Sequence, residues 1–119
     1  MATITRFDFN GLRRAIEERD ASKQLGFYAD DAEVHLVDRD HPPGAARILR
    51  GGGEIRAWLE DVCARDMTHR VSNELVDDGR AAYTVSCRYP DGTKVLCAAM
   101  VDLADGRIVH QLGIQVWDE

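Results

Sequence analysis

The chain has 119 residues, 45% of them hydrophobic, and a formal net charge of −6 at pH 7. This length and apolar fraction predict a single domain, residues 1–119, with one ordinary core. The acidic balance, without a Lys/Arg cluster, argues against binding to nucleic acid or to an anionic membrane surface.

The three cysteines, Cys63, Cys87 and Cys97, are odd in number and lack CxxC spacing. This pattern favours a reduced intracellular protein over a disulfide scaffold, and buried free thiols are the expected state. No segment has the apolar length of a signal-peptide core or of a membrane span. We therefore expect a cytoplasmic protein.

The first half of the chain predicts three helices and one strand. Helical spacing of apolar residues predicts a helix over about 10–20 and a short one over 22–28, and alternation predicts a strand over 32–37. A loop follows, and its three consecutive glycines are interpreted as a flexible connection because they match no nucleotide-binding motif. The clearest helix is predicted over 54–66, where Trp58 belongs to the apolar face.

The second half predicts a meander of four strands. Residues 67–76 alternate in polarity, and Gly-containing turns separate three further strands over about 81–89, 93–103 and 107–117. The strand over 93–103 is apolar at both parities, which predicts that both of its faces are covered. Helices on one face and a partner subunit on the other would provide that cover.

Four blocks in this order carry a resemblance to a known superfamily: Tyr-Ala-Asp-Asp-Ala-Glu-Val (28–34), Gly-Gly-Glu-Ile-Arg-Ala-Trp-Leu (52–59), Tyr-Thr-Val-Ser-Cys-Arg-Tyr (83–89) and Asp-Gly-Arg-Ile-Val (105–109). The chain resembles the nuclear transport factor 2-like (NTF2-like) superfamily, in its SnoaL-like or ketosteroid-isomerase-like branch. The resemblance implies an α+β fold in which a strongly curved, mixed or antiparallel sheet forms a cone around three helices. It also implies a deep central pocket and a homodimer formed through the outer face of the sheet.

The resemblance assigns the two faces of the sheet. The positions that look into the cone in the family match Tyr83, Val85, Cys87, Ala99, Val101, Gln111, Gly113 and Gln115. The apolar positions left outside are Leu96, Met100, Ile108, Leu112 and Ile114, a surface larger than a monomer comfortably exposes.

The chain departs from a ketosteroid isomerase at the positions that carry proton transfer. The base, the hydroxyl donor and the protonated acid of that enzyme align here with Leu36, Leu12 and Ala99, which are all apolar. Because the paired base and oxyanion hole are absent, steroid isomerisation is excluded as a close analogue.

His69 is the first candidate for a catalytic residue. It lies on a strand face that lines the expected pocket, and imidazole titrates in the range that a general acid or base needs. Its segment Thr-His-Arg-Val-Ser-Asn (68–73) resembles one in dehydratase-like members whose histidine transfers protons. Asp38 shares the inward parity of Leu36 and is the second candidate, as a base or as a group that orients His69; the alternative is a solvated loop residue.

The residues expected to contact the substrate are Leu36, Trp58, Asn73, Tyr83, Tyr89, Cys97, Gln111, Gln115 and Trp117. Two functions stay open. One is a small enzyme that uses acid–base catalysis for cyclisation, dehydration, isomerisation or epoxide opening of an apolar cyclic or polyketide-like molecule. The other is a non-catalytic binding or dimerisation module. No cofactor is expected, and no metal, because His35 and His110 fall on the face opposite His69.

Overall fold

The computed structural model describes residues 7–118. Within these residues, the first half of the chain has three α-helices, α1 (Phe9–Glu17), α2 (Ala21–Leu25) and α3 (Gly51–Ala64), and one short 3-10 helix, η1 (Pro43–Ala45). Asp8 caps α1 by accepting a hydrogen bond from the Gly11 amide, and Asp20 caps α2 in the same way, satisfying amides that have no partner within the helix. The short helix predicted over 22–28 ends earlier in the structure, at Leu25. Tyr28, the last residue of the predicted helix, belongs to the first strand.

Six strands form one open mixed sheet in the order β2-β1-β6-β5-β4-β3. They are β1 (Tyr28–Val37), β2 (Arg47–Arg50), β3 (Thr68–Val76), β4 (Arg80–Arg88), β5 (Lys94–Ala104) and β6 (Arg107–Trp117). β1 runs parallel to β6, and every other neighbouring pair is antiparallel. The predicted α+β class and four-strand meander are confirmed. The sequence interpretation missed β2 and treated 51–53 as a loop, whereas these glycines begin α3.

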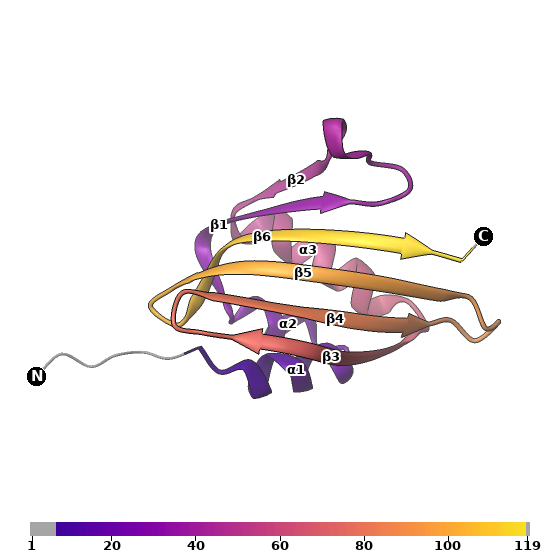
Figure 1. Cartoon of the computed structure of the whole chain (residues 1–119), viewed down its shortest axis with the longest axis horizontal. Helices are drawn as coiled ribbons and strands as arrows, with labels where there is room; N and C mark the ends of the chain where they lie inside the picture. The colour runs from indigo at the N-terminus through magenta and orange to yellow at the C-terminus, as the bar shows by residue number, and fades with distance from the viewer. Residues whose placement is uncertain (1–6, 119) are drawn as a thin grey trace, which may run out of the picture.

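The helices pack against one face of the curved sheet (Figure 1). α1 contributes Phe9 and Leu12 to the core and α3 contributes Ile55 and Leu59, while the inward positions of the strands supply the rest. No helix formed by residues 7–118 covers the other face of the sheet (Figure 1). The core and any enclosed space therefore lie between the helices and the concave face of the sheet.

Two β-bulges change the faces expected from simple alternation. In β6, Ile108 pairs with Leu103 and His110 with Asp102, so one extra residue lies between them and reverses the parity. Ile108 is consequently 0% exposed in the core, and its predicted outward position is wrong. In β3, the register shifts between Ser72 and Leu75, and Asn73 adopts a left-handed φ of 58°.

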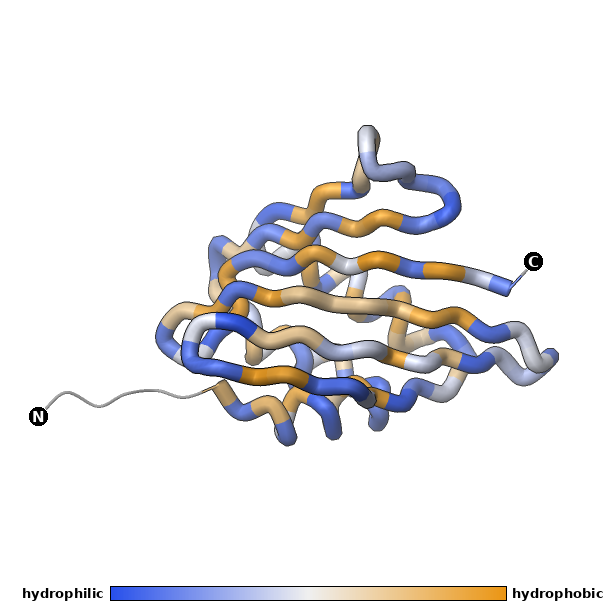
Figure 2. The backbone as a smooth tube through the Cα atoms, in the orientation of Figure 1, coloured by the Kyte–Doolittle hydropathy of each residue, from blue (hydrophilic) through white to orange (hydrophobic). Residues whose placement is uncertain are grey.

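The outer face of the sheet carries exposed apolar side chains along β5 and β6. Leu96 is 50% exposed, Val116 is 64% exposed, and Met100 and Ile114 are also exposed. Apolar colouring runs along most of β5 in Figure 2, in agreement with the two-sided apolar pattern read from the sequence. No helix within residues 7–118 is long and apolar enough to cross a membrane.

Candidate functional site

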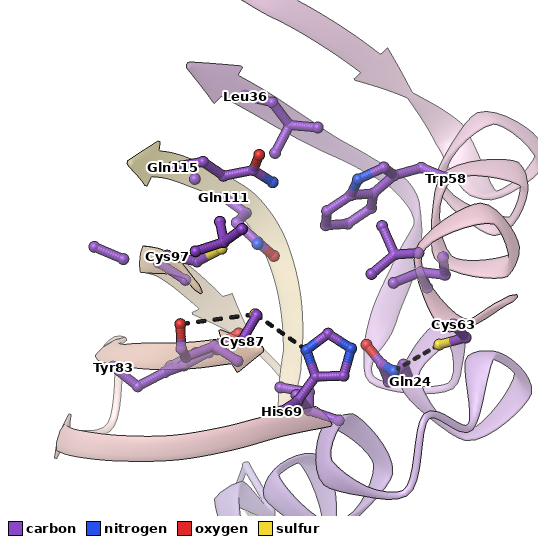
Figure 3. Close-up of a pocket in the computed structure, with 18 of the residues that line it drawn as sticks. Gln24, Leu36, Trp58, Cys63, His69, Tyr83, Cys87, Cys97, Gln111 and Gln115 are labelled. Atoms are coloured by element: carbon purple, nitrogen blue, oxygen red, sulfur yellow. Dashed lines mark hydrogen bonds between the residues drawn. The ribbon is translucent and has the colours of Figure 1, made fainter. Parts of the chain in front are cut away.

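A cavity of about 110 Å³ lies between the concave face of the sheet and the helices. Its wall is mostly apolar and combines residues of α1 and α3 with inward positions of β1, β4, β5 and β6 (Figure 3). Ala99 and Gly113 are cross-strand partners on β5 and β6, and because both are small they leave room at the centre of the sheet. Among the described residues that line the cavity, none is a carboxylate.

His69 and Cys87 form a polar contact in this wall. They are directly opposite each other on β3 and β4, and His69 Nδ1 lies 3.1 Å from Cys87 Sγ (Figure 3). The other ring nitrogen, Nε2, is buried and has no hydrogen-bond partner among the described residues. A buried polar atom without a partner is costly, so a bound molecule or a water is the expected partner.

Cys97 is a second neighbour of Cys87. Cys97, on β5, pairs with Val85, which lies two residues before Cys87 on β4. Both cysteines are free thiols. A hydrogen bond from the Cys97 thiol and the nearby His69 lower the pKa of Cys87 to about 5, although burial acts in the opposite direction. The same contact and burial raise the pKa of Cys97, so Cys87 is the cysteine of this pair that ionises more readily.

Two tyrosines supply hydroxyl groups to the same cavity. Tyr28 donates a hydrogen bond to Gln111 Oε1 at 2.5 Å, and burial raises the pKa of the Tyr28 phenol. Burial also raises the pKa of Tyr83. Both phenols therefore stay protonated at neutral pH and can act as hydrogen-bond donors.

Eight of the predicted site residues line the cavity together: Leu36, Trp58, His69, Tyr83, Cys97, Gln111, Gln115 and Trp117. Tyr89 does not line it, but its ring stacks on Trp117 with the centroids 5.9 Å apart. Trp117 Nε1 in turn donates to Gln115 Oε1. Tyr89 thus supports the cavity wall from outside.

Two predicted residues lie elsewhere. Asn73, placed in the pocket by alternation, is exposed because the β3 bulge turns it away, and its amide donates to Thr84 Oγ1. Asp38 does not line the cavity; its carboxylate accepts a hydrogen bond from the Asp40 amide and contacts His41 Nδ1 at 2.9 Å. The structure therefore pairs Asp38 with His41 in the loop after β1, and the neighbour of His69 is a cysteine.

Sequence reasoning missed Gln24 and Cys63 as cavity residues. Gln24 is buried on α2, and its Nε2 donates to Ala15 O and to Cys63 Sγ, both at 3.3 Å. Burial raises the pKa of Cys63. A polar residue at the buried position of a five-residue helix was the only signal, and it becomes informative only when the partner helix is known.

Among the described residues, the outer face brings together one group of possible metal ligands. Glu33, His35 and His110 place their ligand atoms within 4.8 Å of one another, on β1 and β6. Charged side chains already contact this group. Arg50 Nε lies 3.5 Å from Glu33 Oε2, and Asp102 Oδ2 lies 3.7 Å from His110 Nδ1. Sequence reasoning missed it because Glu33 and His110 become neighbours only through the pairing of β1 with β6.

Comparisons with known proteins agree with this architecture. The family model of the SnoaL-like domain matches residues 9–111. No curated protein matches the chain to a significant degree.

Three solved structures illustrate the likeness in fold. An NTF2-like protein of unknown function from Mesorhizobium loti is 15% identical, with a TM-score of 0.78, over 91% of this chain and 87% of that one. A provisionally named ketosteroid isomerase from Kribbella flavida DSM 17836 is 16% identical (TM-score 0.75; 93% and 75% covered). A provisionally named polyketide cyclase from Sinorhizobium meliloti is 21% identical (TM-score 0.66; 88% and 91% covered). At these identities the likeness concerns the fold alone.

Proposed function

The chain belongs to the family of SnoaL-like domains, and from this premise we propose that it is a small enzyme that transfers protons on an apolar cyclic molecule held in the cavity. The observation that carries the proposal is the environment of the two ring nitrogens of His69. Its Nδ1 is engaged by Cys87, while its Nε2 is buried in a cavity wall and lacks a partner among residues 7–118. A ring fixed at one nitrogen and free at the other is the arrangement of a general acid or base.

The size and lining of the cavity support a small apolar substrate. An engineered apolar cavity of about 150 Å³ accepts benzene, so a space of about 110 Å³ suits a single ring or one ring of a larger molecule. The polar groups available to hold oxygen atoms are Tyr83, Gln111 and Gln115. Few polar groups in an apolar wall are typical of small-molecule sites.

Cys87 takes the place that a carboxylate has beside many catalytic histidines. With its pKa lowered to about 5, the sulfur is a thiolate at neutral pH that accepts a hydrogen bond from Nδ1–H of His69. This fixes the tautomer in which Nε2 carries the free electron pair, and it stabilises the imidazolium that forms when Nε2 takes a proton. Dehydration, isomerisation, cyclisation and epoxide opening all require such a proton transfer.

Exchange of protons for deuterons beside a carbonyl tests the proposal without knowledge of the natural substrate. We expect the protein to accelerate α-carbon exchange of small cyclic ketones in D₂O, measured by proton NMR. His69→Gln should lower the catalysed rate by about 10²–10⁴-fold, the usual contribution of a positioned acid or base. His41→Gln is the matched control, because His41 lies in the loop with Asp38 and outside the cavity wall.

The alternative function predicts a different result in the same samples. Binding of the ketones without accelerated exchange would support a non-catalytic binding module. Equal exchange rates for the wild type and His69→Gln would contradict the role proposed for His69.

A further inference from the structure

We propose that Cys87 is also a nucleophile, which adds reversibly to small α,β-unsaturated carbonyl compounds while His69 delivers the proton. This inference rests on the proposed function, because it assigns the substrate class of the same cavity. The inference is based on the presence of a thiol, rather than a carboxylate, beside the histidine on the inner face. The acid–base role alone does not require a thiol there.

The position of Cys87 supports the nucleophilic role. Its side chain is buried yet lines the cavity, so a molecule that enters the cavity reaches the sulfur while bulk water does not. Opposite partners on antiparallel strands hold Cys87 and His69 in place, and Cys97 approaches from the next strand. A nucleophile next to a fixed base is the arrangement that covalent catalysis uses.

The chemistry of the pair selects the class of electrophile. A thiolate is a soft nucleophile suited to the β-carbon of an enone. A dehydration in this cavity would also make or consume such an enone, because loss of water from a β-hydroxy ketone gives an α,β-unsaturated ketone. The apolar wall accommodates the ring, and the protonated phenol of Tyr83 is available to hold the carbonyl oxygen.

The addition balances without a further reactant. The sulfur electron pair forms the bond from Sγ to the β-carbon, and the carbon–carbon π bond breaks and moves its electrons into an enolate. His69, which has taken up a proton from solvent at Nε2, then protonates the α-carbon from that nitrogen and returns to the neutral form. The product is a neutral thioether ketone, and the reverse sequence, in which Nε2 removes the α-proton and the thiolate leaves, regenerates the enone.

The pH dependence of labelling is the diagnostic property, because access to the cavity changes the absolute rate but not the shape of the profile. At pH 6 a thiol of ordinary pKa is about 0.1% ionised, whereas one with a pKa of about 5 is about nine-tenths ionised. The rate at Cys87 should therefore be nearly constant between pH 6 and 8, whereas an ordinary thiol reacts about tenfold faster per pH unit. The other titratable groups that line the same cavity are His69, Cys97, Tyr28, Tyr83, Cys63 and Arg65.

The test uses 2-cyclohexenone as the probe and intact-mass and peptide mass spectrometry as the readout. Borohydride reduction of the ketone stops the reverse reaction before analysis. We expect one adduct per chain, at Cys87, with a flat profile from pH 6 to 8. Cys87→Ser should abolish the adduct, and Cys63→Ala, the control in the same cavity, should keep it.

Two further variants test the cause of the reactivity. Cys97→Ala removes the thiol that donates to the Cys87 sulfur, and His69→Gln removes the imidazole, so either variant should slow labelling at pH 6 and restore a rising profile. A thiolate whose thiol has a lowered pKa is intrinsically less nucleophilic, with a Brønsted slope of about 0.4–0.5. The advantage at pH 6 is then about tenfold, and each variant should lose up to that factor.

Several outcomes would overturn the inference. Labelling of Cys63 alone, or a tenfold rise per pH unit at Cys87, would show that Cys87 is an ordinary buried thiol. A flat profile with iodoacetamide but no adduct with cyclohexenone would refute the enone class. Because adducts are measured by mass, loss of the adduct with ketone exchange intact would reject this inference and leave the proposed function standing.

Discussion

Filling the cavity should stabilise the fold and abolish ligand binding at the same time. Ala99→Val is the best substitution for this purpose, because Ala99 is buried in the wall opposite Gly113. Gly113 itself is unsuitable, since an added Cβ would meet Leu36 Cδ2 at 2.9 Å. Valine adds two carbons to a space of about 110 Å³, and burial is worth about 0.8 kcal/mol per CH₂. The free energy of unfolding should rise by about 1–2 kcal/mol.

Urea denaturation and binding of a cyclic ketone, measured on the same variant, check this expectation. Ala32→Val is the matched control, because Ala32 is 0% exposed and lies outside the cavity wall. Overpacking there should lower the free energy of unfolding by about 1–3 kcal/mol. If Ala99→Val destabilised the protein like the control, or left ketone binding unchanged, the cavity would not be the space that we describe.

Two further predictions concern assembly and pH. We propose that the exposed apolar face of β5 and β6 mediates a homodimer that buries about 800 Å² or more per partner. Light scattering should show a dimer that Leu112→Glu converts to a monomer, and a monomeric wild type would contradict the proposal. Ala57→Glu is the control, because Ala57 is exposed on α3, on the side of the sheet that the helices cover. The second prediction follows from the pKa of Cys87, which is lower in the folded chain than its ordinary value of 9.0. Its contribution to stability is therefore complete above about pH 9 and lost as the pH falls through about 5, by at most about 1.4 kcal/mol per unit. Urea midpoints of the wild type should rise from pH 6 to 8 relative to Cys87→Ser, and parallel profiles would refute a lowered pKa.

Local patterns were sufficient to predict most of the fold. The Gly-containing turns fixed the four-strand meander, and the bounds predicted for the last strand, 107–117, agree with β6. The short strand β2 was missed because four residues with charged ends have no periodic signal. Its existence depends on pairing with β1, which is not encoded locally.

The candidate site was predictable as far as strict alternation holds. Alternation placed His69 and Tyr83 on the inner face, and the family resemblance assigned Gln111 to it; the structure has all three there. It failed at Asn73 and Ile108, because a bulge reverses every inference about faces beyond it. The contact between His69 and Cys87 also escaped prediction, because it requires the register of β3 against β4 and not only the parity of each strand.

The position of a bound ligand relative to His69 tests the central claim most directly. A crystal structure of the protein soaked with 2-cyclohexenone or cyclohexanone should show the ring in the cavity, near Ala99 and Gly113. We predict that the carbonyl oxygen or the adjacent carbon lies within about 3.5 Å of His69 Nε2. A ring bound outside the cavity, or an Nε2 engaged by a protein group that excludes the ligand, would contradict the account.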